Sequence, residues 1–150
     1  MSVNTSFQMR DKEVSDRYVV YVEEKRVIAR YEISLIRKDD FVYIDAGTTA
    51  EFLLDHITEA MEMLFRYNFT IGFWGTDGIH RKTGYTTPDR EEAGVKHALF
   101  CNCKKGYIVA DSSKFDFISP VRFAKFEDVV IITEKIAEGY GGFENIIIVE

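Results

Sequence analysis

Cysteine is scarce in this sequence, and its scarcity excludes a disulfide scaffold. Cys101 and Cys103 are the only two cysteines in 150 residues, whereas small secreted domains that depend on disulfides are much richer in cysteine. Their C-x-C spacing comes with no second cysteine pair and no nearby histidine pair, so it is a poor zinc-binding pattern. We therefore expect two reduced thiols at the end of a helix, and neither a metal ion nor another cofactor.

Long apolar runs are also missing, and so is an apolar leader. No run approaches the roughly 20 residues that a membrane span needs. The first residues are polar, among them Ser2, Asn4 and Thr5, and they lack the apolar core of a signal peptide. We expect a cytoplasmic protein without membrane contact.

Basic charge is in short supply. The 19 lysines and arginines are outnumbered by 25 acidic residues, which gives a formal net charge of -6. Contacts to nucleic-acid phosphates need a basic surface, so this balance argues against DNA binding by the chain itself. The 46% of hydrophobic residues is ordinary for a globular protein. No repeat or linker divides the sequence, and we expect a single domain over residues 1–150.

Short apolar runs recur along the chain, and helical segments separate them. Runs rich in β-branched and aromatic residues are typical of strands buried on both faces. Strands that alternate with helices predict an α/β fold, with a largely parallel sheet and helices on both of its faces. The runs are Phe41–Ile44, Phe69–Trp74, Tyr107–Ala110, Val129–Ile132 and Ile146–Val149.

Three segments have the residue spacing of helices. One starts near Glu23, the second covers residues 50–67, and the third covers residues 87–103. We expect Thr87 to cap the third helix and Pro88 to be its first residue, ahead of an acidic first turn. The first helix has an apolar face. This face consists of Val27, Ile28, Tyr31 and Leu35.

An aspartate follows three of the predicted strands, each time beside small or hydroxyl residues. These aspartates are Asp45, Asp77 and Asp111. The carboxyl ends of parallel strands meet at one edge of the sheet, and ligands bind at that edge. The sequence therefore predicts a polar crevice lined by carboxylates, hydroxyls and Lys114.

The loop after Asp45 has the composition of an anion site. Gly47 allows close approach of the backbone to a ligand. Thr48 and Thr49 supply hydroxyls, and the next helix would present free N–H groups and the positive end of its dipole to a phosphate. A capped turn without a ligand explains the same residues equally well. The carboxylates and the lysine suit sugar hydroxyls, but they could also transfer protons beside a carbonyl.

Glu92 and Lys96 are one helical turn apart. Spacing alone favours a solvated pair, which stabilises a helix by about 0.2–0.5 kcal/mol. A role in ligand binding is the alternative.

Three ordered motifs resemble the C-terminal domain of DeoR-family transcriptional repressors. They are Y-I-D-A-G-T-T at residues 43–49, G-T-D-G-I at 75–79 with G-Y-T-T-P-D-R-E-E-A-G-V-K at 84–96, and V-A-D-S-S-K-F at 109–115. The similarity extends over most of residues 20–135, and three motifs in order are far more specific than one. Within the family, the sequence most resembles repressors of sugar phosphotransferase operons, such as those for lactose.

The resemblance implies a fold like that of ribose-5-phosphate isomerase. It also implies a phosphorylated sugar as the effector that controls operator binding, and a binding domain that is not an enzyme. An isomerase-like enzyme acting on sugar phosphates is the alternative, and a domain that only oligomerises is a third. We also expect a homo-oligomer.

The same resemblance assigns the effector's two ends to different residues. The phosphate end would contact Asp45, Gly47, Thr48 and Thr49. The sugar end would contact Asp77, Gly78, Glu92, Lys96, Asp111, Ser113 and Lys114.

The sequence departs from the family pattern in two places. A winged helix-turn-helix precedes this domain in the family, and nothing in residues 1–40 resembles one, so we expect DNA binding only through a domain absent from this chain. The family also has further strands before the G-x-D-G motif, whereas here Ile57 leads almost directly into residues 58–64. We expect a segment to be missing after Ile57, either deleted from the protein or left out of the sequence. Its loss would remove part of the crevice wall.

Overall fold

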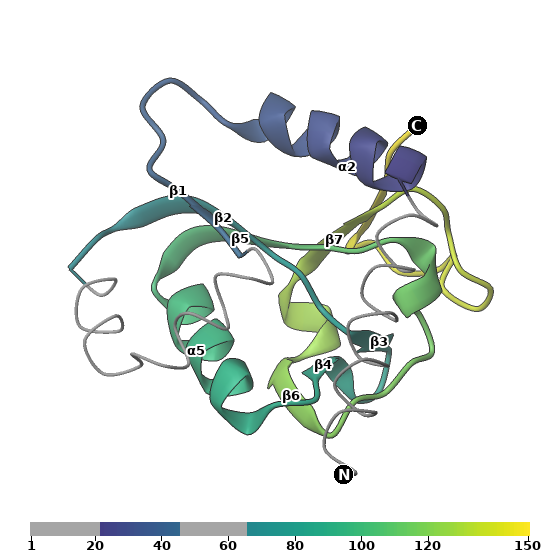
Figure 1. Cartoon of the computed structure of the whole chain (residues 1–150). Coiled ribbons are helices and arrows are strands. Elements are labelled where there is room, and N and C mark those ends of the chain that lie inside the picture. Colours follow the sequence, from purple (N-terminus) through teal and green to yellow (C-terminus); the bar gives the residue numbers. More distant parts are fainter. Residues whose placement is uncertain (1–21, 46–65) are drawn as a thin grey trace, which may run out of the picture.

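A five-stranded parallel sheet lies at the centre of the fold (Figure 1). The computed structural model describes residues 22–45 and 66–150. The strands lie in the order β1-β2-β5-β7-β8, and every pair of neighbours is parallel. All five therefore end at the same edge, as the apolar runs predicted. They are β1 Val42–Ile44, β2 Phe69–Trp74, β5 Cys103–Val109, β7 Val130–Thr133 and β8 Ile146–Ile148.

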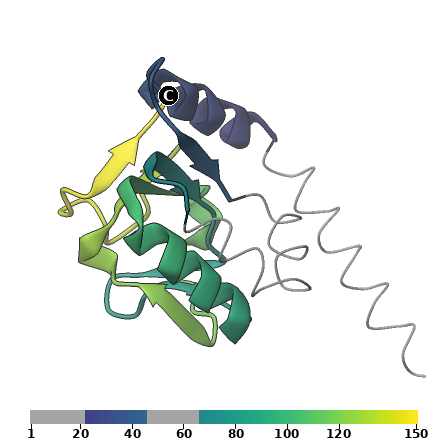
Figure 2. The ribbon, with the colours of Figure 1, turned by 90° about the vertical axis from the view of Figure 1, so that its left-hand side faces the viewer.

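Two helices cover opposite faces of this sheet, which confirms the predicted layering (Figures 1 and 2). Helix α2 (Val22–Leu35) packs its predicted apolar face against a core cluster that includes Phe73 and Ile132. Helix α5 (Arg90–Cys101) contributes Leu99 to the core cluster on the other face. Because side chains alternate along a strand, the neighbours Ile131 and Ile132 belong to different clusters, and both are fully buried.

A second, antiparallel sheet lies below the first and was not predicted from the sequence (Figure 1). Its strands are β3 Gly78–His80, β4 Gly84–Thr87 and β6 Val121–Ala124, in the order β3-β4-β6. They are short and contain few apolar residues, so they lack the pattern of buried strands. The sheet is held instead by tertiary packing, because Tyr85 of β4 is completely buried against Phe126 and Phe123.

Helix α5 begins two residues later than the sequence suggested, at Arg90 and not at Pro88. Its N-cap is Asp89, whose carboxylate accepts hydrogen bonds from the N–H groups of Glu91 at 2.7 Å and Glu92 at 3.2 Å. The prediction of Thr87 as the cap is wrong, because Thr87 is the last residue of β4, where it pairs with Val121. If Thr87 capped the helix, its buried pairing with Val121 would be lost, and that loss costs more than the cap would contribute.

The first strand of the sheet is less covered than expected. Among the described residues, strand β1 has a neighbour on one side only, and Ile44 is 58% exposed. The expectation of a strand buried on both faces is therefore wrong for β1, and also for β8, where Ile148 is 42% exposed. Strands β2 and β7 meet it. The predicted helix over residues 50–67 falls almost entirely outside the described residues, and Arg66 and Tyr67 lie in a turn. Within the described ranges, no helix is long and apolar enough to cross a membrane.

Candidate functional site

Polar residues gather at the edge where the parallel strands end. Asp45 follows β1, Gly75 follows β2, Asp111 lies just beyond β5, and Glu134 follows β7. The N–H of Asp45 donates to the carbonyl of Phe73 at 2.9 Å, which fixes Asp45 beside the end of β2. The edge therefore carries three carboxylates from three different strands, and two of them were predicted.

Lys96 of α5 is buried beside the ends of β1 and β2. Its Nζ donates to the carboxylate of Asp45 and to the carbonyl of Gly75 at 2.9 Å. The side chains of Lys96 and Asp45 are only 7% and 5% exposed. The interpretation of Lys96 and Glu92 as a solvated pair is therefore wrong, because the lysine is buried and its tighter partner is Asp45 on another strand. Glu92 lies further away, at 3.6 Å.

The second sheet completes the surroundings of the Lys96 ammonium. Phe123 of β6 presents its ring with the centroid 5.4 Å from Nζ, a cation–π contact. A buried ammonium is costly unless its charge is balanced and its N–H groups are bonded. Carboxylates, a carbonyl and a ring face meet that need here.

Glu92 is the carboxylate of this cluster with a perturbed pKa. Partial burial raises the pKa of Glu92, and the negative charges of Asp77 and Asp45 raise it further. The nearby Lys96 ammonium and a hydrogen bond from Thr87 lower the pKa without cancelling the rise. Two carboxylates, Asp45 and Glu92, thus pair with one ammonium, and the charge of Asp77 acts on Glu92 beside them. Such a cluster accepts hydrogen bonds from neutral donors more readily than it accepts a further anion.

The raised pKa of Glu92 predicts how stability changes with pH. The folded state binds this proton more tightly than the unfolded state. The carboxyl's contribution is therefore most favourable at low pH, and it is lost as the pH rises from the ordinary value of 4.5 through the raised folded value. We expect Glu92→Gln to gain stability relative to the wild type between pH 4 and pH 7, measured by urea unfolding. Glu91→Gln, an exposed change on the same turn, is the control. A difference that is constant or falls with pH would contradict this.

Asp77 is held at the start of the small sheet. Its carboxylate accepts a hydrogen bond from the Thr87 hydroxyl at 3.1 Å, and its N–H donates to the carbonyl of Thr86 at 3.2 Å. Thr87 is thus a site residue that sequence reasoning assigned to a helix cap. The predicted site residue Gly78 is buried, and a Cβ there would lie 2.2 Å from the carbonyl oxygen of Phe117. Close packing therefore suffices to explain this glycine.

The loop after β5 is organised by its own aspartate. Asp111 is buried and caps the short helix η1 (Ser112–Lys114), accepting hydrogen bonds from the N–H of Ser113 at 3.0 Å and from its hydroxyl. Ser113 is exposed and Lys114 half-buried. In the described part of the chain, no hydrogen bond or ion pair joins this loop directly to Lys96. The three predicted residues therefore form a second group on the same edge.

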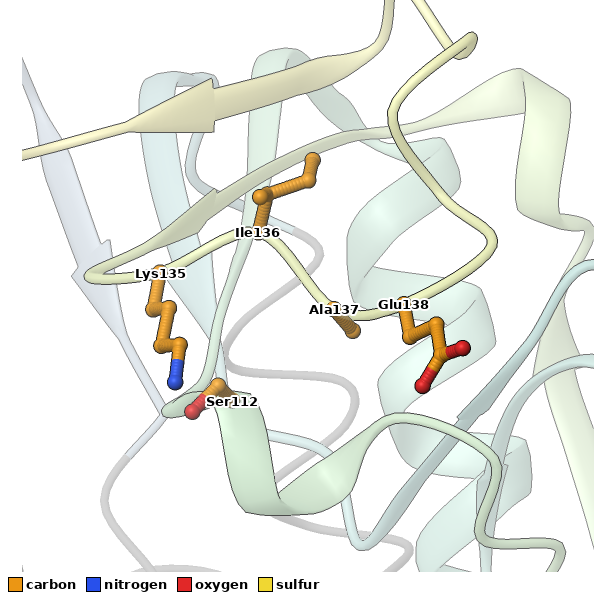
Figure 3. Close-up of a pocket in the computed structure, with 5 residues that line it drawn as sticks. All are labelled: Ser112, Lys135, Ile136, Ala137 and Glu138. Carbon is orange, nitrogen blue, oxygen red and sulfur yellow. The ribbon is translucent and has the colours of Figure 1, made fainter.

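Glu134 anchors that loop and was missed by sequence reasoning. Its carboxylate accepts hydrogen bonds from the Ser112 N–H at 3.0 Å, from the Ser112 hydroxyl at 2.6 Å and from the Thr133 hydroxyl at 3.1 Å. The available signal was its position, since it follows β7 as Asp45 follows β1. A cavity of about 460 Å³ adjoins this loop (Figure 3). It is lined by Ser112, Lys135, Ile136, Ala137 and Glu138.

The predicted phosphate end is described only in part. Gly47, Thr48 and Thr49 lie outside the described residues. Asp45 is described, and it lies with Lys96 and Glu92, two residues predicted for the sugar end. The structure thus brings together Asp45, Asp77, Glu92 and Lys96, and it holds Asp111, Ser113 and Lys114 in a separate loop.

Comparisons with known proteins give a consistent result. The sequence profile of the DeoR C terminal sensor domain matches residues 58–135, slightly more than half of the chain. The uncharacterized HTH-type transcriptional regulator FruR of Bacillus subtilis is 28% identical over 78% of this chain and 63% of its own length. The HTH-type transcriptional regulator GlpR of Haloferax volcanii is 32% identical over 67% of this chain, which spans 40% of that protein.

A further match covers a smaller part of the chain. The lactose phosphotransferase system repressor of Staphylococcus epidermidis is 32% identical over 36% of this chain and 22% of its own length. The chain therefore spans less than two thirds of each of these relatives.

Proposed function

Because this chain belongs to the family of DeoR C-terminal sensor domains, we propose that it binds a phosphorylated sugar as the effector of a transcriptional repressor of sugar metabolism. The observation that carries the proposal is the buried Lys96 with the carboxylates of Asp45 and Glu92 paired to it and Asp77 close to Glu92, at the edge of a parallel sheet where ligands bind. A winged helix-turn-helix outside this chain would contact the DNA. By the same likeness, we propose that the protein works in the cytoplasm as a homo-oligomer.

The negative charge of the cluster suggests that the sugar hydroxyls and the phosphate bind different residues along the edge. Carboxylates accept hydrogen bonds from sugar hydroxyls but repel a phosphate. We therefore place the hydroxyls against Asp77 and Glu92, both partly exposed. Asp45 is buried and paired, so we give it the role of holding Lys96 in place. The phosphate would bind the hydroxyl and N–H groups of residues 47–49, which directly follow Asp45 in the chain.

The second group on the edge would contact the far side of the sugar. Lys114 is half-buried at the end of η1, and the loop that carries it is fixed by Glu134 through Ser112. A loop fixed from a neighbouring strand presents its lysine at a defined position, as a specific binding site requires. This assigns Asp111 to positioning and Ser113 and Lys114 to contact.

The alignment with FruR supports a missing segment. It has 159 positions, yet it includes only 78% of the 150 residues of this chain, or about 117. FruR therefore has about 40 residues in that span without a counterpart here. We propose that the difference includes the family strands expected after Ile57.

A thermal-shift experiment tests the proposed function. Pentose and hexose phosphates are screened, and we expect at least one of them to raise the midpoint of thermal unfolding. A ligand at 100 times its Kd adds about 2.7 kcal/mol to the stability of the folded state. The matching free sugars and inorganic phosphate should produce a much smaller shift. Asp77→Asn and Thr48→Ala should each weaken the effect, while the exposed Asp39→Asn serves as the control. A folded chain that responds to no sugar phosphate would refute the proposal.

One observation favours a second candidate function, isomerisation of a sugar phosphate. Glu92 combines a raised pKa with proximity to Lys96, an arrangement that suits proton transfer next to a carbonyl. The same sugar phosphates, followed by NMR over hours with the protein present, distinguish the two. Turnover at an enzyme-like rate that Glu92→Gln abolishes would establish an enzyme, whereas binding without turnover supports the sensor.

A further inference from the structure

A cysteine and a histidine face each other on the exposed side of helix α5, apart from the residues of the proposed effector site. The Sγ of Cys101 lies 3.7 Å from Nε2 of His97, four residues earlier on the helix. Both residues are exposed to solvent. A thiol next to a nitrogen base is the arrangement that activates cysteine as a nucleophile, provided that the base is available to accept its proton.

The other ring nitrogen of His97 decides that question. Nδ1 lies 2.9 Å from the carbonyl oxygen of Phe123 on β6. A carbonyl oxygen only accepts hydrogen bonds, so Nδ1 must carry the hydrogen in this contact. In the neutral ring, Nε2 is then left with its lone pair pointing at the Cys101 thiol. The contact with β6 therefore fixes both the orientation of the ring and the tautomer that can take a proton.

The position of the pair on the helix also matters. Cys101 is the last residue of α5, and His97 is one turn before it. The negative end of the helix dipole disfavours an isolated thiolate there, but it favours an imidazolium. Transfer of the proton from Cys101 to His97 creates both charges together. The favourable interaction of the imidazolium with the negative end of the helix dipole then offsets the unfavourable interaction of the thiolate.

Cys103 provides an internal contrast only two residues away. Its thiol donates to the carbonyl of Lys105 at 3.4 Å. This oxygen cannot remove the proton from sulfur under physiological conditions. Partial burial also raises the pKa of the Cys103 thiol. The two cysteines therefore differ in the atom that faces the sulfur, a ring nitrogen for Cys101 and a carbonyl oxygen for Cys103.

We propose that Cys101 is a site of reversible oxidation by a peroxide, with His97 as the base that activates it. The Cys101 thiolate attacks one oxygen of the peroxide, an S–O bond forms, and the O–O bond breaks. Sulfur is oxidised by two electrons to the sulfenic acid, and the departing hydroxide takes the proton from His97 to give water. A small thiol then condenses with the sulfenic acid to form a mixed disulfide and a second water. This site does not depend on sugar binding.

The test compares the two thiols within the intact chain. The reduced protein is treated with hydrogen peroxide in the presence of dimedone, which traps sulfenic acids, and the adducts are located by mass spectrometry of peptides. We expect Cys101 to be labelled about tenfold faster than Cys103 at pH 7, because Cys101 has a nitrogen base beside its sulfur and Cys103 does not. Equal rates, or faster labelling of Cys103, would overturn the proposal.

A variant isolates the contribution of the base. His97→Gln retains an amide N–H that can donate to the Phe123 carbonyl but removes the imidazole base, and circular dichroism checks that it is folded. We expect the labelling of Cys101 to slow to about the rate of Cys103, and its steep dependence on pH to move to more alkaline conditions. Labelling that stays fast in the folded His97→Gln variant would show that exposure alone makes Cys101 reactive. If that variant does not fold, His97→Asn, which also lacks the imidazole base, takes its place with the same two outcomes.

Discussion

Replacement of Lys96 by methionine is expected to lower the free energy of unfolding by about 3–5 kcal/mol. The side chains of Lys96 and Asp45 are almost fully buried against each other, so loss of the ammonium leaves the Asp45 carboxylate uncompensated in the interior. Methionine has a similar length and adds no charge, so the missing ion pair accounts for most of the effect. Urea unfolding at pH 7 measures it.

Two further variants give this prediction its specificity. The double variant Lys96→Met/Asp45→Asn removes both charges, and we expect it to recover a large part of the lost stability, because the penalty arises from one unpaired charge. Lys104→Met changes an exposed lysine on the adjoining strand and is expected to alter stability by less than about 0.5 kcal/mol. If Lys96→Met were as stable as Lys104→Met, the buried ion pair would not hold β1 against α5.

Gly84→Ala is expected to be the other strongly destabilising change, by about 2–5 kcal/mol. Gly84 has a φ of +80°, a conformation that costs a residue with a Cβ about 1–2 kcal/mol. An added Cβ would also lie 2.3 Å from the carbonyl oxygen of Ala124 on β6, and a backbone atom cannot move aside without disrupting the small sheet. Forced overpacking typically adds about 1–3 kcal/mol.

Gly94→Ala is the matched control for this prediction. Gly94 lies within α5, is exposed, and has no atom within 4 Å of an added Cβ. Alanine is a better helix former than glycine, so we expect this variant to be more stable than the wild type by about 0.5–1 kcal/mol. Thermal unfolding of both variants gives the comparison. A Gly84→Ala protein that unfolds at the wild-type temperature would contradict the conformation assigned to the turn between β3 and β4.

Local pattern was sufficient for the main sheet and for the face of α2. Strands β2 and β7 are continuous apolar runs because both of their faces are covered, whereas β5 has the exposed Lys104 and Lys105 near its start and is apolar only in its second half. Helix α2 has apolar residues at a spacing that only a helix places on one side. The aspartates after these runs could be assigned to one edge, because parallel strands all end on the same side. Asp45 and Asp111 lie there as expected.

Features that depend on residues distant in sequence could not be predicted in this way. The partner of Lys96 is 51 residues away, and no spacing rule connects the two. Glu134 fixes a loop 22 residues earlier in the chain. Thr87 has the composition of a helix cap but lies in a strand, because it pairs with Val121. In each case the local preference is worth about 1 kcal/mol or less, and the tertiary contact outweighs it.

The class of fold, the family and the edge of the sheet that carries the polar residues can thus be read from hydrophobic runs and motifs that are local in the chain. Three features depend on the folded arrangement: Lys96 is a buried ion-pair partner, the pKa of the Glu92 carboxyl is raised, and His97 is oriented towards Cys101. Each of these depends on burial and on contacts across elements, because charge and hydrogen-bond energies are set by the surroundings that folding creates.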